Sequence, residues 1–229
     1  MQSVDIADRV SEVRQRIGDA TARGGHGQAV TIVAVTKTHG ADAVEAAWRA
    51  GLHDVGENRV QEALQKMDET SVPVRWHLIG HLQRNKVKGA VERFALVHSI
   101  DSERLAYAVH EYGASRAAPI DVLIQVNTSG ESTKGGFGIR ELPAIAERIA
   151  GLTGIRVRGA MTMAPLDATD TELRRVFAGA REARAILGRA CGPLVTELSM
   201  GMSNDYEVAV EEGATMVRLG TILFGARDQ

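Results

Sequence analysis

A lysine stands directly after an apolar run in the first part of the chain, in the sequence VTIVAVTKTH. The amine of a lysine becomes a nucleophile when burial or a neighbouring cation lowers its pKa, and it then forms Schiff bases with carbonyl compounds. A solvated strand end would also place a lysine at this position. Lys37 is therefore a candidate Schiff-base lysine that needs support from other parts of the sequence.

Small and hydroxyl-bearing residues gather in two turns near the C-terminus, in SMGMSND and RLGT. Gly201 and Gly220 would let backbone N–H groups approach an anion closely, and Ser203 and Thr221 would add hydroxyl donors. Barrel proteins often bind phosphate on the loops after their last two strands, so these turns form a candidate phosphate site, with ordinary strand–helix turns as the alternative. Arg218 lies in the last candidate strand, where a buried charge is costly unless it has a partner.

Other polar residues follow the middle strands and have less specific interpretations. Asn58 either belongs to a polar cluster that caps the next helix or points its amide into a pocket. His77 and His81 run from a strand into a loop with no carboxylate or cysteine nearby in the sequence, which argues against a metal site. The stretch 128–138 is rich in glycine and serine and predicts a flexible loop, or a mobile lid over a binding site.

Short β-branched runs alternate with helical patterns, which is typical of a parallel α/β fold. The expected strands are Val30–Thr36, Leu52–Val55, Val74–Ile79, Ala95–Ser99, Ile120–Val126, Ile155–Met161, Leu194–Ser199 and Thr215–Leu219. The expected helices between them include Ala41–Ala50, Ser102–Ser115, Glu141–Leu152 and Asp170–Ala190, with Asp101 and Asp170 as N-caps and Ser203 as the N-cap of a helix through Val210.

One further helix opens the chain, with an apolar stripe of Ile6, Val10, Val13 and Ile17. About eight strands in a chain of this length favour a single TIM-type (β/α)8 barrel with an extra N-terminal helix, forming one domain over residues 1–229. A doubly wound open sheet is the competing architecture, because periodicity alone does not separate the two. In both folds ligands bind at the carboxyl ends of the strands.

The bulk properties exclude several classes of protein. The 229 residues carry a net charge of −2, so no global field attracts nucleic acid or anionic membrane. Cys191 is the only cysteine, which precludes an internal disulfide and fits a reducing cytosol. The charged N-terminus does not resemble a secretion signal, and no apolar run is long enough to span a bilayer. These features together predict a cytoplasmic protein.

Several separate runs together resemble one known family: AVTKTH, GENRVQEA, WHLIGHLQRNK, TELSMGMSNDYEVAVEEG and MVRLGTILFGARD. The chain is similar to the YggS/PROSC-type pyridoxal phosphate homeostasis proteins over nearly its whole length. The resemblance implies a monomeric barrel related to the N-terminal domain of alanine racemase, with pyridoxal 5'-phosphate (PLP) bound covalently to Lys37. The further PLP-binding residues that it implies are Ser203, Gly220 and Thr221 at the phosphate, Arg218 at the ring nitrogen, and Asn58, Met200 and Gly201 along the pocket.

The resemblance implies storage or delivery of PLP, with PLP-dependent apo-enzymes as recipients and without established catalytic turnover. A PLP-dependent amino-acid racemase is the alternative, but racemisation needs proton donors on both faces of the substrate carbanion. In the racemases a tyrosine from an added C-terminal domain supplies the second donor, and we expect none here because the sequence ends shortly after the last strand. A sugar aldolase using Lys37 is a third class. His39-Gly40 departs from the Lys-Pro of many relatives, and the loop around Gly135-Gly136 leaves a role of Lys134 as a second PLP-accepting amine open.

Overall fold

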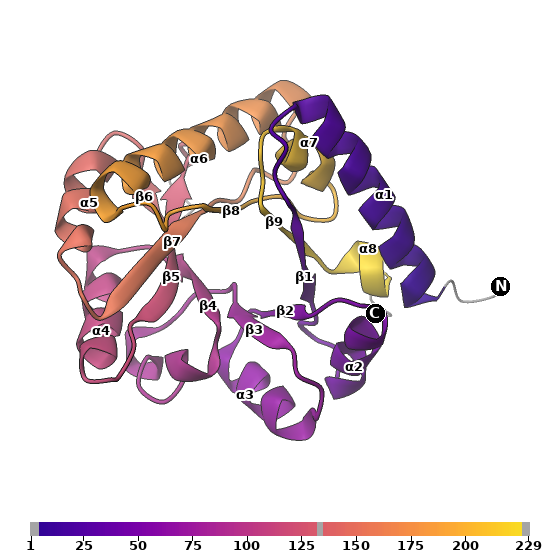
Figure 1. The fold of residues 1–229 in the computed structure, drawn as a ribbon, viewed down its shortest axis with the longest axis horizontal. Helices are drawn as coiled ribbons and strands as arrows, with labels where there is room; N and C mark the ends of the chain where they lie inside the picture. The colour runs from indigo at the N-terminus through magenta and orange to yellow at the C-terminus, as the bar shows by residue number, and fades with distance from the viewer. Residues whose placement is uncertain (1–4, 132–134, 226–229) are drawn as a thin grey trace.

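Eight parallel strands close into a barrel in this computed structural model, which describes residues 5–131 and 135–225. Around the barrel the strands follow the order β4-β3-β2-β1-β9-β8-β7-β5, and the pairing of β4 with β5 closes the ring (Figure 1). The barrel strands are β1 (Thr31–Val35), β2 (Asp54–Glu57), β3 (Arg75–Leu78), β4 (Leu96–Ile100), β5 (Ile120–Asn127), β7 (Ile155–Met161), β8 (Glu197–Ser199) and β9 (Met216–Leu219). The predicted TIM-type barrel is confirmed, and the open-sheet alternative is wrong.

The strands lie where apolar, β-branched runs were expected, because each is covered by helices outside and by side chains inside. β1, for example, is the run TIVAV, and only its first residue is not buried. The main difference concerns β2, which was expected to end at Val55 but continues through Gly56 and the fully buried Glu57. A short extra strand, β6 (Phe137–Gly138), pairs with the end of β5 and was not predicted.

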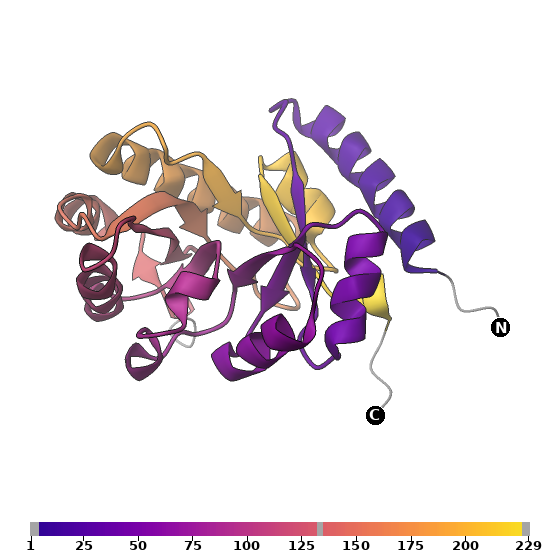
Figure 2. The same ribbon diagram turned by 60° about the horizontal axis from the view of Figure 1, so that its bottom comes forward.

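Helices surround the ring of strands in both ribbon views (Figures 1 and 2). The α-helices are α1 (Ile6–Gly24), α2 (Ala41–Arg49), α3 (Val60–Glu69), α4 (Glu103–Ala114), α5 (Leu142–Ala150), α6 (Asp170–Cys191), α7 (Tyr206–Glu211) and α8 (Thr221–Phe224). Between β3 and β4 the chain forms two short 3-10 helices, η1 (Arg84–Lys86) and η2 (Val91–Arg93), instead of an α-helix.

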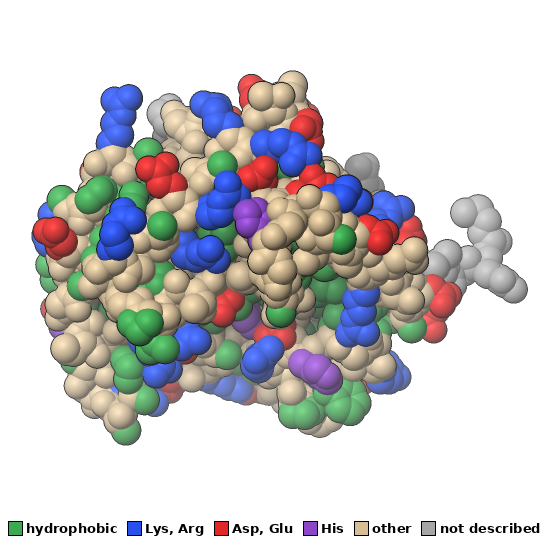
Figure 3. Space-filling model, turned by 45° about the horizontal axis from the view of Figure 1, so that its top comes forward, with side chains coloured by type: hydrophobic (Ala, Val, Ile, Leu, Met, Phe, Trp, Pro, Cys, Tyr) green, Lys and Arg blue, Asp and Glu red, His purple; other side chains and the backbone are tan. Residues whose placement is uncertain are grey.

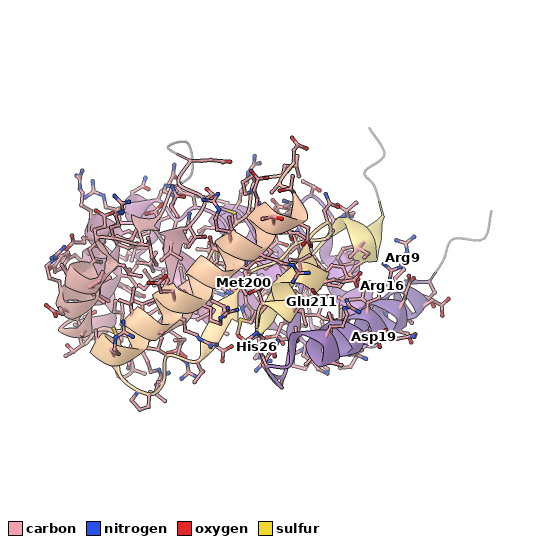
Figure 4. All side chains as sticks on the ribbon, turned by 90° about the horizontal axis from the view of Figure 1, so that it is seen from above. Arg9, Arg16, Asp19, His26, Met200 and Glu211 are labelled. Atoms are coloured by element: carbon pink, nitrogen blue, oxygen red, sulfur yellow. The ribbon has the colours of Figure 1, made fainter. Side chains whose placement is uncertain are left out.

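The extra N-terminal helix packs beside α7 and α8, on the outside of the last two strands. As predicted, Val10, Val13 and Ile17 are buried along one face of α1. Ion pairs add a second connection, because Glu211 on α7 lies between Arg23 on α1, at 2.6 Å, and Arg174 on α6, at 2.7 Å. Figure 4 shows the labelled Glu211 between the ribbons of α1 and α6. α1 therefore supports α7, which directly follows the candidate phosphate turn of SMGMSND.

For three helices the N-cap residue in the structure differs from the predicted one. α4 is preceded by Ser102 rather than Asp101, and α6 is capped by Thr169 rather than Asp170. Thr169 and Glu172 form a reciprocal capping box, which satisfies two N–H groups at once. Asp205, not Ser203, occupies the N-cap position of α7, and its carboxylate accepts a hydrogen bond from the backbone N–H of Met202 instead. Ser203 is thereby left within the turn.

The surface carries charges of both signs. On the face shown in Figure 3, lysine and arginine side chains alternate with aspartate and glutamate, and neither sign dominates. Within residues 5–131 and 135–225, no helix has the length and apolar character required to cross a membrane.

Candidate functional site

A cavity of about 580 Å³ opens at the carboxyl ends of the barrel strands. It brings together residues that follow each of the eight barrel strands, although these segments are far apart in the sequence. Six predicted site residues line it: Lys37, Asn58, Ser203, Arg218, Gly220 and Thr221. The cavity is within the size range of small-ligand sites and combines apolar walls with a few converging polar groups.

Lys37 lies in a tight turn with unusual backbone geometry. The next residue, Thr38, has a φ of 68°, which is a strained conformation for a β-branched residue. The backbone N–H of Thr38 donates to Glu62 Oε1 at 2.7 Å, and the N–H of His39 donates to the carbonyl of Thr36 at 3.0 Å. These bonds hold Lys37 at the cavity wall.

An ion cluster of Glu57, Glu62 and Lys66, of which Glu57 and Lys66 are buried, supports this turn. Lys66, on α3, donates from Nζ to the carbonyl of Thr36 at 2.8 Å, to Glu57 Oε1 at 2.7 Å and to Glu62 Oε1 at 3.0 Å. Burial raises the pKa of Glu57, while hydrogen bonds from Lys66 and Thr36 act in the opposite direction. The sequence analysis missed this cluster because it placed Glu57 after its strand; the spacing of Glu62 and Lys66 along one helix face was the available signal.

Arg218 forms part of the cavity wall from within the barrel and is only 4% exposed. Its guanidinium donates from Nη1 to Ser199 Oγ at 2.7 Å and from Nη2 to the carbonyl of Thr162 at 2.9 Å. Burial lowers the pKa of Arg218 to about 10, against the opposing effect of the Asp205 charge, so the side chain remains a cation at neutral pH. These two hydrogen bonds offset part of the cost of burying the guanidinium.

The turns after β8 and β9 lie against each other at one side of the cavity. Ser203 Oγ accepts a hydrogen bond from the backbone N–H of Ile222 at 3.4 Å, which connects the first turn to α8. Gly201 has a φ of 92°, and a Cβ there would lie 2.7 Å from the Cβ of Ala209, so only glycine fits. Gly201 and the fully buried Met200 were expected to line the pocket, but neither does. Their packing shapes the turn that presents Ser203.

The two histidines considered for a metal site, His77 and His81, lie in different surroundings. His81 is at the cavity rim, where its Nδ1 contacts Asp101 Oδ2 at 3.1 Å. His77 instead points into the barrel and contacts His98 and Asp54. Within residues 5–131 and 135–225, no three histidine, cysteine, aspartate or glutamate side chains are arranged so that they could hold a metal ion.

The glycine-rich loop after β5 borders the cavity through Gly135, whose carbonyl accepts a hydrogen bond from Gln125 Nε2 at 2.8 Å. Lys134, considered as a second amine for the cofactor, lies outside the described residues.

Comparison with known proteins gives consistent results. Residues 10–228 match the family described as "Alanine racemase, N-terminal domain". The chain is 43% identical to a "Pyridoxal phosphate homeostasis protein" of Pseudomonas aeruginosa, covering 97% of this chain and 96% of that protein. It is 40% identical to the protein of the same name from Escherichia coli strain K12, covering 98% and 97% of the two chains.

Solved structures show the same barrel. PipY of Synechococcus elongatus, in a structure described as having PLP bound, superposes with a TM-score of 0.84 at 37% identity, covering 96% of this chain and 100% of that chain. Alanine racemase from Corynebacterium glutamicum shares the fold with a TM-score of 0.75 at 20% identity, and this chain spans 61% of it. The protein therefore belongs to the pyridoxal phosphate homeostasis protein family, within the larger family of alanine racemase N-terminal domains.

Proposed function

We propose that this protein binds PLP covalently through Nζ of Lys37 and serves the homeostasis of the cofactor, storing it and delivering it to PLP-dependent apo-enzymes. The names of its relatives and the PLP described in the PipY structure support this role. The observation that carries the proposal is a single cavity that unites the lysine, a buried cation and two hydroxyl-bearing turns.

The residues present fit the chemical groups of PLP. Lys37 can supply the amine for the aldehyde, and Ser203, Gly220 and Thr221 can supply hydroxyl and backbone donors for the phosphate. Arg218 can face the ring nitrogen, while Asn58 lines the neighbouring wall. When bound, PLP supplies an electron sink for amino groups attached to it.

Arg218 at the ring nitrogen favours a carrier over a strong catalyst. An arginine side chain donates hydrogen bonds but does not accept a proton, and it remains charged at neutral pH. A ring nitrogen that faces such a cation stays unprotonated and withdraws electrons less strongly than one that faces an acid. The Arg218 guanidinium thus supports retention of PLP more than turnover.

The tyrosines give further support for a non-catalytic role. Racemisation would need a second proton donor opposite Lys37. The three tyrosines of the chain are all described, and none lines the cavity: Tyr107 and Tyr112 lie on α4, and Tyr206 is buried at the start of α7. Sustained formation of D-alanine from L-alanine by the purified, PLP-loaded protein would contradict this part of the proposal.

The binding mode is tested by the visible spectrum and by covalent trapping. We expect the purified protein with PLP to show an absorption band of the bound cofactor, and borohydride followed by mass mapping to place the modification on Lys37. Lys37→Ala should lose both the band and the modification. Lys88→Ala changes an exposed lysine outside the cavity and should retain both. Modification of another lysine in the wild-type protein would show that Lys37 is not the attachment site.

A further inference from the structure

A continuous row of buried polar side chains leads away from the cavity through the barrel interior. It consists of Asp54 on β2, His77 on β3, His98 on β4, Ser199 on β8 and Arg218 on β9. Asp54 Oδ1 and His77 Nε2 are 2.8 Å apart, His77 Nδ1 and His98 Nε2 are 2.9 Å apart, and His98 Nδ1 and Ser199 Oγ are 3.0 Å apart. None of the five is more than 5% exposed.

The contact between His98 and Ser199 crosses the barrel. β4 pairs with β3 and β5, whereas β8 pairs with β7 and β9, so these two side chains meet through the interior and not along the sheet. Asp54 is the first residue of β2, while Arg218 lines the cavity. The row therefore connects the start of β2 with the cavity wall.

The ends of the row determine the direction of its hydrogen bonds. Burial raises the pKa of Asp54, but hydrogen bonds from His77 and Arg75 more than offset this and hold the pKa below its ordinary value. The Asp54 carboxylate is therefore an acceptor at neutral pH, and His77 must donate to it from Nε2. At the other end, Arg218 has only donors, so Ser199 Oγ must accept from it.

The two histidines complete the order if both are neutral. His77 then accepts at Nδ1 from His98 Nε2–H, and His98 accepts at Nδ1 from the hydroxyl of Ser199. Each contact in the row then joins one donor to one acceptor, with all donors directed from Arg218 toward Asp54. Burial keeps the pKa of His98 well below its ordinary value, and the charge of Arg218 acts in the same direction, which agrees with a neutral His98 ring.

A charged His77 would give a different order. It would donate to both Asp54 and His98, and His98 would then donate to Ser199 from Nδ1. Ser199 Oγ would accept from both His98 and Arg218, which leaves its own proton without an acceptor in the row. Because unsatisfied buried donors are costly, the contacts favour the neutral order.

We propose that Asp54, His77, His98 and Ser199 are positioning residues for Arg218, holding its guanidinium at the cavity through one ordered row of hydrogen bonds. Apolar side chains could fill the barrel interior, as Leu96, Leu123 and Met161 do in a neighbouring cluster. The polar row instead provides the buried guanidinium with a fixed orientation. If PLP binds as in the proposed function, with Arg218 at its ring nitrogen, the row also influences the electronic state of the PLP ring.

The proton order is tested directly in the protein without PLP. Long-range ¹H–¹⁵N correlation spectra of histidine-labelled protein report the protonation and tautomer of each ring, and His98→Phe assigns the His98 signals by their loss. We expect both His77 and His98 to be neutral, with the proton on Nε2. An imidazolium, or a proton on Nδ1 of either ring, would overturn the proposed order.

The effect on Arg218 is tested with the PLP-loaded protein. His98→Phe keeps an aromatic ring but breaks the row, and we expect its cofactor band to move in the same direction as in Arg218→Ala, with faster loss of PLP. Ile145→Val alters the buried side of α5, which packs mainly against α6 outside the ring of strands, and should leave both properties unchanged. A folded His98→Phe protein with the wild-type band and release rate, or an equal change in Ile145→Val, would refute a positioning role.

The two measurements separate this inference from the proposed function. A wild-type protein that takes up no PLP would refute the proposed function, yet its histidine tautomers would still decide the order of the row. If His98→Phe does not fold, the wild-type tautomers and the band of Ser199→Ala, which removes the hydroxyl between His98 and Arg218, test the same connection.

Discussion

Thr38, next to the candidate PLP lysine Lys37, has a strained backbone conformation. A φ of 68° at a β-branched residue persists only when its surroundings enforce it, and such strain costs about 1–3 kcal/mol. Glu62 provides part of this enforcement through the N–H of Thr38, and Lys66 connects Glu62 to Glu57 and to the carbonyl of Thr36. The position of Lys37 thus depends on an ion cluster that does not itself line the cavity.

Substitution of Lys66 should disturb both stability and PLP retention. In Lys66→Met the carboxylate of Glu57 loses its buried cation, and breaking a buried ion pair costs about 3–5 kcal/mol. We expect the free energy of unfolding, measured with urea, to fall by about this amount, and bound PLP to dissociate faster because the Lys37 turn loosens.

A double variant provides the matched control. In Glu57→Gln/Lys66→Met the uncompensated charge is gone, and the amide oxygen can still accept from the hydroxyl of Thr36. This variant should therefore be more stable than Lys66→Met alone. If both unfold at the same urea concentration, the buried charge of Glu57 is not the source of the destabilisation.

At the scale of elements, α6 shows how a helix end shapes the cavity. The segment before α6 contributes Pro165, Leu166 and Ala168 to the cavity lining, and the capping box of Thr169 and Glu172 determines where this segment becomes helical. The backbone N–H of Thr169 donates to Glu172 Oε2 at 2.8 Å. The N-cap thus positions one rim of the cavity.

Thr169→Ala should destabilise the protein by about 1 kcal/mol, because an alanine side chain cannot accept a hydrogen bond from a backbone N–H in the first turn of the helix. Asp170→Ala, one residue further along, removes no cap and should cost less. Urea midpoints of the two variants measure the difference. A larger loss in Asp170→Ala would restore the sequence-based assignment of Asp170 as the cap.

For the whole molecule, PLP binding should couple to the stability of the barrel, because the proposed ligand contacts come from the turns after several strands. A ligand at a hundred times its dissociation constant stabilises the folded state by about 2.7 kcal/mol. For a chain of this size that corresponds to a rise in Tm of roughly 5–10 °C. Differential scanning calorimetry of the wild-type protein with and without PLP should show this rise.

The Lys37→Ala protein is the comparison for this measurement. It retains the proposed phosphate and ring contacts but lacks the covalent bond, so its Tm should rise by less than that of the wild-type protein. Equal rises in the two proteins would indicate that PLP stabilises the barrel without bonding to Lys37.

The sequence by itself determined the alternation of strands and helices, the extra N-terminal helix and the residues that follow each strand. These features depend on local patterns: apolar runs for strands buried on both sides, and a periodic stripe for α1. Because parallel strands bring their carboxyl ends to one rim, the positions of Lys37, Asn58, Ser203 and Thr221 could be expected to converge. The identity of the expected ligand, PLP, came from the family resemblance.

Only the tertiary structure decided which polar groups are buried together. Glu57 and Lys66 meet across β2 and α3, and His98 meets Ser199 across the barrel, where no sequence spacing indicates a contact. The closure of β4 on β5 likewise separates a barrel from an open sheet. These features arise from long-range packing of side chains that are hidden from solvent, where a polar group is stable only beside a partner that the fold brings to it.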